Sequence, residues 1–317
     1  MTIRSLSFHA TYGCRHSGVC CRSRWPIAVE ADRVAAISAI DPNGLLYPSD
    51  APAQTPALLR VIDHRCAFFD EQDGRTCRVH TALGHEALPL ACRQFPRVVV
   101  VDPRGVSVTL SHYCPTAAAM LEDPAPVRIV ESPPAFPANG EYIGLDAHAG
   151  FPPQLRPDVL MDWESWWAFE ARAVELIGNW RGDPAGVLAA LSAIVERVRT
   201  WNPGDGELTE RVEKAFRRLS SGLKAQGSGI TEAKGSRDHG IQCRFLAAHA
   251  FGNWTAHLGQ GLRSWLRSLQ AAYALLQTGS SVQKADLLLR HEADPDEQAA
   301  KWSEAEGTGL RNFTPPT

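Results

Sequence analysis

From Arg97 to Leu110 the chain reads RVVVVDPRGVSVTL, and this stretch is its clearest structural signal. Two runs rich in β-branched residues flank Asp102-Pro103-Arg104-Gly105, a turn sequence that contains both proline and glycine. The pattern predicts a β-hairpin. Cys92 lies shortly before the first strand and Cys114 shortly after the second, so we expect the hairpin to bring these two cysteines together.

Cysteines are concentrated in the first third of the chain. Seven of the eight lie within the first 114 residues, and only Cys243 lies beyond them. The N-terminus lacks the long apolar segment of a secretory signal, so we expect a cytoplasmic protein in a reducing compartment. There, clustered thiols favour metal binding or redox chemistry over disulfides. The predicted metal ligands are Cys14, Cys20, Cys21, Cys66, Cys77, Cys92 and Cys114.

The composition is that of a globular protein, because the 317 residues are 44% hydrophobic and 21% charged. The 35 acidic and 32 basic residues give a formal net charge of −3, which provides no overall attraction to nucleic acid or to anionic lipid. No apolar run approaches the roughly 18–20 residues of a membrane span. We therefore expect neither a nucleic-acid partner nor a membrane partner, and the sequence indicates no particular oligomeric state.

The pattern predicts an α+β protein that begins with a small cysteine-rich domain over residues 1–121, which includes the β-hairpin. In this metal-binding domain we expect a helix over Glu30–Ile40 and strands over Leu58–Ile62 and Thr76–His80. Eight prolines between residues 122 and 158 indicate an extended connector along the surface.

Beyond the connector the pattern becomes helical, and we expect a mainly α-helical domain over residues 159–302 and a flexible tail over residues 303–317. Asp162 and the pair Asp183-Pro184 are typical of helix N-termini. Eight of the nine tryptophans follow residue 160, and we interpret them as core residues of this domain. The predicted helices cover residues 162–180, 183–201, 207–223, 241–276 and 286–293, of which 241–276 is either two helices or one helix kinked at Gly259–Gly261.

The cysteine set exceeds a single tetrahedral site. Zinc takes four protein ligands and a cubane 4Fe-4S cluster usually takes four thiolates, whereas seven candidates are present. Cys20 and Cys21 are adjacent, and adjacent side chains point in different directions, which fits two irons of one cluster better than one zinc ion. We therefore expect an iron–sulfur cluster, with zinc as the alternative.

Arginines and histidines flank these cysteines. The arginines either stabilise thiolates or simply reflect a high arginine content; they are Arg15, Arg22, Arg65, Arg78 and Arg93. The histidines are either additional ligands or surface and packing residues; they are His16, His64, His80 and His112. Cys243 lies on an apolar helical stretch and is expected to be a buried small hydrophobic residue.

Four cysteine motifs follow one another in the first third of the chain. They are Gly18-Val19-Cys20-Cys21-Arg22, Cys66-Ala67-Phe68, Cys77 followed by Leu83-Gly84, and Cys92-Arg93-Gln94-Phe95-Pro96-Arg97. Together they resemble the YkgJ-like cysteine-cluster family, which is described as zinc- or iron-chelating. This resemblance covers residues 14–121.

Three further segments are similar to the branch of that family typified by flagellin lysine-N-methylase. They are Cys114-Pro115-Thr116-Ala117-Ala118, Arg24-Trp25-Pro26-Ile27 and the helical stretch Phe245–Phe251. The resemblance implies a cysteine-ligated iron–sulfur centre. It also implies S-adenosylmethionine-dependent methylation of lysine side chains, so that the partner would be a flagellin-like protein substrate with exposed lysines.

The sequence departs from two common methyltransferase patterns. It lacks the Cys-x3-Cys-x2-Cys run of radical S-adenosylmethionine enzymes, and it lacks a Gly-x-Gly-x-x-Gly turn after a strand. The sequence therefore assigns neither catalytic nor cofactor-binding residues. The alternative functions are a non-catalytic zinc- or iron-binding module with a structural role, and a metal-delivery or redox-sensing protein.

Overall fold

The computed structural model describes residues 1–47, 56–71, 76–225, 237–291 and 297. Over these residues the protein has the mixed α+β structure that the sequence predicts. The chain forms two compact units. Unit 1 consists of Met1–Tyr12, Val98–Tyr113 and Ala117–Thr317, and unit 2 consists of Gly13–Arg97 and Cys114–Thr116.

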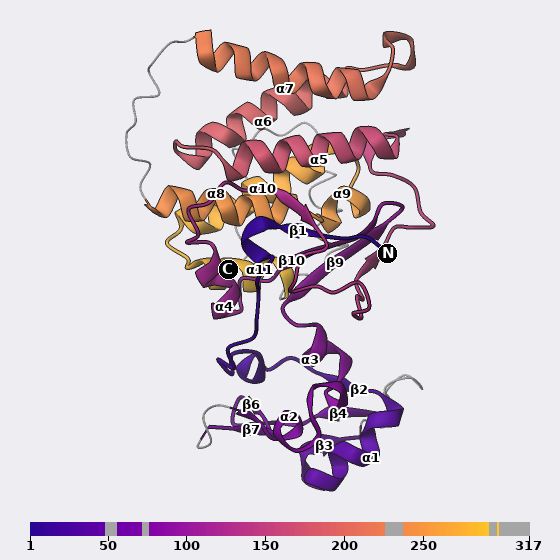
Figure 1. Cartoon of the computed structure of the whole chain (residues 1–317), viewed down its shortest axis with the longest axis vertical. Coiled ribbons are helices and arrows are strands. Elements are labelled where there is room, and N and C mark those ends of the chain that lie inside the picture. The colour runs from indigo at the N-terminus through magenta and orange to yellow at the C-terminus, as the bar shows by residue number, and fades with distance from the viewer. Residues whose placement is uncertain (48–55, 72–75, 226–236, 292–296, 298–317) are drawn as a thin grey trace. The chain divides into compact units, whose positions relative to one another are not determined.

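The predicted hairpin is confirmed as β9 (Arg97–Asp102) and β10 (Gly105–Leu110). These strands belong to a five-stranded sheet of order β11-β1-β10-β9-β12. β1 (Ile3–Leu6) pairs with β10 in parallel, with Ile3 opposite Val106 (Figure 1). Gly105 has a φ of +119°, and a Cβ there would lie 2.3 Å from the Thr2 carbonyl oxygen, so the turn requires glycine.

The hairpin is part of unit 1, whereas we expected it within the cysteine-rich domain. The reason is its pairing with β1 and the burial of its apolar side chains, since Val106, Val108 and Leu110 are fully buried. A parallel pairing between strands so distant in the chain leaves no local signal in the sequence.

The proline-rich segment 122–158 forms more regular structure than the extended connector that we predicted. It supplies β11 (Ile129–Glu131) and β12 (Leu145–Asp146), which are the two edge strands of the sheet. It also supplies β13 (Gln154–Arg156), which pairs with β14 (Val159–Leu160). Edge strands tolerate nearby prolines because one side of such a strand makes no ladder hydrogen bonds.

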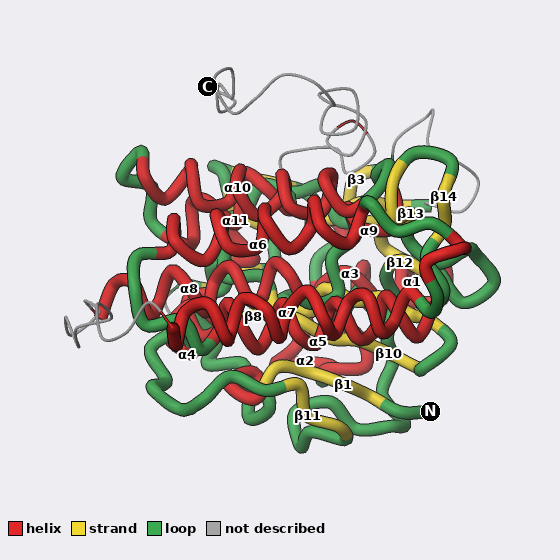
Figure 2. The backbone as a smooth tube through the Cα atoms, turned by 90° about the horizontal axis from the view of Figure 1, so that it is seen from above, coloured by secondary structure: helices red, strands yellow, loops and turns green. Residues whose placement is uncertain are grey.

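Helices make up most of unit 1 after residue 160. They are α5 (Trp163–Gly178), α6 (Pro184–Arg199), α7 (Leu208–Ala225), α8 (Arg237–Ala250), α9 (Trp254–Leu258), α10 (Leu262–Gln277) and α11 (Val282–Arg290). Shorter elements are η1 (Ser7–His9), η5 (Pro203–Asp205) and α4 (Pro115–Met120). Figure 1 shows α5, α6 and α7 stacked on one side of β1, β9 and β10, and in Figure 2 α6 and α10 run alongside each other.

Local signals define several helix ends. The Ser165 N–H donates to Asp162 Oδ1 at 2.7 Å and the Ala185 N–H donates to Asp183 Oδ1 at 2.8 Å, so both predicted N-caps are confirmed. The stretch 241–276 does break near Gly259–Gly261, where α9 ends and α10 begins, but it also breaks between α8 and α9, so it forms parts of three helices. The last predicted helix, 286–293, instead begins at Val282, where the Ser281 side chain caps it.

An aromatic and aliphatic core joins these helices. Trp166 and Trp265 are 1% and 0% exposed, and the ring of Phe169 meets that of Trp265 edge-on with 5.1 Å between centroids. The interpretation of the tryptophans as core residues is confirmed for these two. Among the described helices, none combines the length and apolar character needed to span a membrane. The predicted tail, 303–317, lies outside the described residues.

Unit 2 is built from short elements around a small core of its own. α1 (Ala31–Ile40) confirms the helix predicted over Glu30–Ile40, and it buries Ile37 against Phe68 and Val79. Its other elements are η2 (Cys20–Arg22), β2 (Ala28–Val29), η3 (Pro42–Gly44), β3 (Leu45–Leu46), β4 (Ala57–Leu59), β5 (Val61–Ile62), β6 (Arg65–Cys66), β7 (Phe69–Asp70), β8 (Thr76–Cys77), α2 (Arg78–Leu83), η4 (His85–Ala87) and α3 (Leu90–Gln94).

Two predicted strands of unit 2 are shorter in the structure. The stretch 58–62 divides at Arg60, whose N–H donates to the Gly44 carbonyl and whose carbonyl accepts from Ala67, so this residue joins two different sheets. The stretch 76–80 is a strand only to Cys77, and the helix α2 begins at Arg78. So short a segment fits both periodicities, and the prediction of a strand through His80 was wrong.

Candidate metal centre

Cys20 and Cys21 lie on the turn η2. Gly18 has a φ of +70° before the turn, and the Cys21 N–H donates to the Gly18 carbonyl at 3.2 Å. The hydrogen bond from the Cys21 thiol lowers the pKa of Cys20 to about 7. The same hydrogen bond, together with burial and neighbouring thiolate charge, raises the pKa of Cys21. The hydrogen bond between the two thiols therefore favours ionisation of Cys20 over ionisation of Cys21.

Cys66, Cys77 and Cys92 come from three other elements of unit 2. Cys66 ends β6 opposite Val61, Cys77 ends β8 opposite Phe69, and Cys92 lies within α3. All three side chains pack against the hydrophobic core of the unit. The strand β6 also contacts η2, which carries the adjacent cysteine pair.

The five thiols of η2, β6, β8 and α3 influence one another's ionisation. Burial raises the pKa of Cys66 to about 11, and thiolate charge on Cys77 and Cys20 adds to this effect. Burial also raises the pKa of Cys77, with Cys20 adding to it. The pKa of Cys92 lies well above its usual value because of burial and then because of Cys66, Cys20 and Cys77. The structure therefore places Cys20, Cys21, Cys66, Cys77 and Cys92 within electrostatic reach of one another.

The other three cysteines have different surroundings. Cys14 is exposed, and its sulfur accepts a hydrogen bond from the His16 N–H at 3.4 Å. Cys114 is 5% exposed and groups with unit 2. Cys243 is buried in α8 of unit 1, as predicted, and burial raises its pKa to about 12. All eight cysteines lie in the described part of the chain, and none of them forms a disulfide.

Arg78 carries positive charge to this group of thiols. Its charge acts to lower the pKa of both Cys66 and Cys77, against the larger effect of burial. The guanidinium is held in place because it donates to Asp41 Oδ2 at 3.0 Å and to the Ala67 carbonyl at 2.7 Å. For this arginine the structure favours the electrostatic interpretation of the sequence pattern.

Two other arginines that flank cysteines have structural partners. Arg65 forms an ion pair with Glu71 across the β6–β7 connection. Arg93 is 7% exposed and donates to the carbonyl oxygens of Leu88 at 2.9 Å and Glu86 at 3.1 Å.

A row of histidine rings lies on unit 2. The ring centroids of His16 and His80 are 5.4 Å apart, and those of His80 and His85 are 5.9 Å apart. His85 Nδ1 lies 3.3 Å from Glu86 Oε1. The sequence analysis selected His16 and His80 because they flank cysteines, and it missed His85, which lies five residues after His80.

The sequence analysis also missed a buried cluster of titratable side chains in unit 1. His249 Nε2 lies 3.0 Å from Asp286 Oδ1, and His112 Nδ1 lies 3.8 Å from the same oxygen. His9 Nε2 lies 3.2 Å from His112 Nε2. His9, His112 and Asp286 are 0% exposed. These residues are far apart in the chain, so no spacing in the sequence indicates the cluster.

Asp286 is the anion of this buried cluster. Burial acts to raise its pKa, but the neighbouring His112 ring, the hydrogen bond to His249 and the charge of Arg290 hold that pKa well below its usual range. Ser111 Oγ donates to Asp286 Oδ2 at 2.5 Å and lies 2.7 Å from His291 Nε2. Because the hydroxyl proton points at the carboxylate, His291 does not activate Ser111 as a nucleophile. The network links α8 and α11 to the segment that follows β10.

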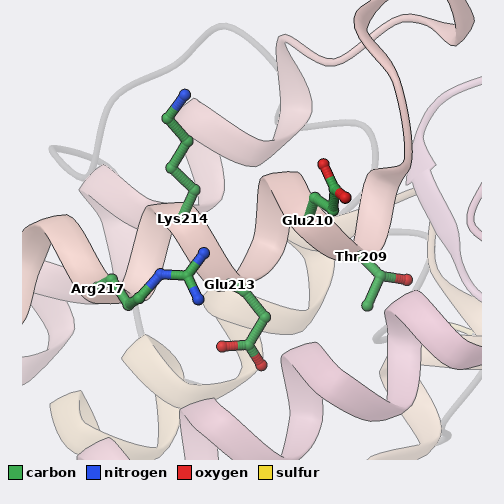
Figure 3. A pocket seen from close by; sticks show the side chains of 5 residues that line it. All are labelled: Thr209, Glu210, Glu213, Lys214 and Arg217. Atoms are coloured by element: carbon green, nitrogen blue, oxygen red, sulfur yellow. The ribbon is translucent and has the colours of Figure 1, made fainter.

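A surface hollow of about 510 Å³ lies along α7 (Figure 3). The described side chains that line it come from that helix and include charges of both signs; they are Thr209, Glu210, Glu213, Lys214 and Arg217. Glu213 is already paired with Arg172 of α5 at 3.1 Å. The hollow therefore presents a solvated charged helix face rather than a pair of catalytic groups.

Among the described residues, no group of three or more His, Cys, Asp or Glu side chains could hold a metal ion in its present arrangement. Coordination by the five thiols, or by the histidine row, therefore requires rotation of side chains from their present rotamers. Comparison with known proteins gives no relative, since no protein-family model, no curated protein and no solved structure matches the chain.

Proposed function

We propose that unit 2 is a thiolate metal centre with ligands from Cys20, Cys21, Cys66, Cys77 and Cys92. The observations that carry this proposal are the packing of Cys66, Cys77 and Cys92 against one core and the contact of β6 with η2, and the five thiols also affect one another's pKa values. Several thiolates held close together repel one another, and a bound cation removes that repulsion because it takes up the deprotonated sulfurs. The absence of disulfides among the eight cysteines fits a reducing, cytoplasmic location, which we propose as well.

An iron–sulfur cluster fits this donor set better than a single zinc ion. Five thiols exceed the four ligands of a tetrahedral zinc site. On a 3-10 turn such as η2, successive side chains diverge by about 120°, so Cys20 and Cys21 can reach two irons of one cluster more easily than one ion. Cys114 is the next candidate ligand because it groups with unit 2, and Cys14 is the most exposed candidate.

For the reaction that this centre serves, we propose S-adenosylmethionine-dependent methylation of lysine side chains on a protein substrate. The support is the resemblance of the cysteine motifs to the flagellin lysine-N-methylase branch. The cofactor's sulfonium supplies the methyl group, and the lysine amine must be neutral when it attacks. The S–CH3 bond breaks, the N–CH3 bond forms and the amine releases one proton.

Anaerobic purification of the untagged chain, followed by metal and sulfide analysis, tests the metal centre. We expect iron and acid-labile sulfide in similar amounts, together with charge-transfer absorption in the visible range. A colourless protein that contains zinc would show that the centre is a zinc site and not an iron–sulfur cluster. If neither metal is retained, and iron with sulfide cannot be reconstituted into the protein, the proposed metal centre is wrong.

Equilibrium dialysis with isotope-labelled S-adenosylmethionine tests the reaction separately. The metal-loaded protein should bind the cofactor and transfer labelled methyl groups to lysines of a flagellin-type protein. Failure of cofactor binding by metal-loaded protein would rule out the methyl transfer and leave the metal centre in place.

A further inference from the structure

We propose that His16, His80 and His85 form a second metal site on unit 2, which binds a divalent transition-metal ion through imidazole nitrogens. This site uses none of the five thiols of the proposed metal centre. It is therefore an addition to the proposed function and can be tested without it.

The spacing within each of two neighbouring ring pairs, His16 with His80 and His80 with His85, fits a shared ion. Two imidazoles that bind one tetrahedral ion at about 2.0–2.1 Å have their ring centroids roughly 5 Å apart. The observed centroid distances are 5.4 Å between His16 and His80 and 5.9 Å between His80 and His85. His16 and His85 are exposed, so the side-chain rotations that turn their nitrogens toward one point meet little steric resistance.

The backbone places the three rings together. Gly84, with a φ of +85°, ends α2, and its N–H donates to the His80 carbonyl at 2.9 Å, so the chain turns back and His85 lies beside His80. His16 has a φ of +52°, a left-handed conformation that is uncommon for a residue other than glycine. Such conformations occur where the surrounding structure maintains them, often at functional sites.

The contact of His85 with Glu86 is an independent observation that points to a metal. His85 Nδ1 lies 3.3 Å from Glu86 Oε1, so its N–H can donate to the carboxylate and leave the Nε2 lone pair available. Histidines that bind metals commonly donate their other ring N–H to a carboxylate in this way. Three neutral imidazoles suit Zn²⁺, Ni²⁺ or Cu²⁺ and leave a coordination position for water.

Calorimetric titration of the untagged full-length protein with Ni²⁺ tests this site. We expect one nickel ion per chain beyond any metal already present. His80→Gln removes the central imidazole and should weaken nickel binding by at least about tenfold, and Glu86→Gln should weaken it by about 10–100-fold. His16→Asn is a second ligand variant whose side chain tolerates the left-handed backbone. His148→Gln, an exposed histidine of unit 1, is the matched control and should bind nickel like the unchanged protein.

The outcomes separate this site from the thiol centre. If Cys66→Ser loses the metal that copurifies with the protein but still binds nickel, the two sites are distinct. Nitrogen splitting in the electron paramagnetic resonance spectrum of bound Cu²⁺ would also support an imidazole site. Undiminished nickel binding by both His80→Gln and His16→Asn would overturn the proposal. So would loss of nickel binding in Cys66→Ser alone, because the added ion would then be bound by the thiols.

Discussion

His249 Nε2 lies 3.0 Å from Asp286 Oδ1, so the helices α8 and α11 share a hydrogen bond in the interior of unit 1. Arg290 Nε lies 3.2 Å from the same carboxylate oxygen. Asp286 is 0% exposed, and the Arg290 side chain is 13% exposed. The cation and the anion are thus buried as a pair, and the removal of either one leaves the other uncompensated.

Asp286→Asn should therefore be strongly destabilising. The variant leaves the Arg290 charge without its partner, and the loss of one member of a buried ion pair costs about 3–5 kcal/mol in the free energy of unfolding. Urea unfolding measures this change. Glu164→Gln, at an exposed position on α5, is the control and should stay within about 0.5 kcal/mol. An equally small change for Asp286→Asn would show that the network does not stabilise unit 1.

The free energy of unfolding should decrease as the pH falls from about 6.5 to about 4. Burial lowers the pKa of His249, His257 and His291 to about 4, whereas an unfolded histidine titrates near 6.5. In this window the unfolded chain binds more protons than the folded protein, so acid favours unfolding. Each residue contributes up to about 1.4 kcal/mol per pH unit. Equal urea midpoints at about pH 7.5 and about pH 5 would contradict this prediction.

Single Cys→Ser substitutions should reveal which thiols hold the metal. The substitutions at Cys20, Cys21, Cys66, Cys77 and Cys92 should each reduce the iron retained on anaerobic purification, because each removes a thiolate from the group. Cys243→Ser is the matched control, since this thiol is buried in α8 of unit 1. Loss of iron from the control to the same extent would mean that the centre depends on unit 1 as well.

In reduced, metal-free protein, Cys20 should react with iodoacetamide before Cys66 does. The pKa of Cys20 is about 7 and that of Cys66 is about 11, so a far larger fraction of Cys20 is thiolate at neutral pH. The lower nucleophilicity of the more acidic thiol offsets this only in part, and we expect a rate at least about tenfold higher. Peptide mass spectrometry after short labelling times measures both rates, and faster labelling of Cys66 would be inconsistent with the hydrogen bond between Cys20 and Cys21.

Gly44→Ala should disturb the core that supports the thiols. A Cβ at Gly44 would lie 2.4 Å from Phe68 Cζ, and Phe68 is fully buried, so the ring must move. Overpacking of this kind costs about 1–3 kcal/mol. We expect lower thermal stability and less retained metal, whereas Gly204→Ala, which meets no atom within 4 Å, should change neither. Equal behaviour of the two variants would show that Phe68 adapts without cost.

Features that depend on a few consecutive residues could be predicted from the sequence. The hairpin follows from two β-branched runs and one turn, and the caps at Asp162 and Asp183 follow from a single side chain and the adjacent backbone. The strand predicted through His80 was wrong because the residues after Cys77 fit a strand and a helix equally well.

Features that depend on distant residues could not be predicted in this way. The pairing of Ile3 with Val106 and the contact of His9 with His112 join segments that precede and follow Gly13–Arg97 in the sequence. Nothing in the local pattern of either segment specifies its partner. The candidate thiols could be selected because cysteines are rare and were concentrated in one part of the sequence. Which of them face one another depends on the short elements that carry them.

The parallel pairing of β1 with β10 has a consequence for protein synthesis. The ribosome delivers β1 first and must then complete nearly all of the cysteine-bearing unit before β10 emerges. Until then the backbone groups of β1 have no strand partner, and such a strand on a nascent chain is prone to aggregation. If the proposed metal centre of unit 2 forms during the same interval, its assembly precedes closure of the sheet.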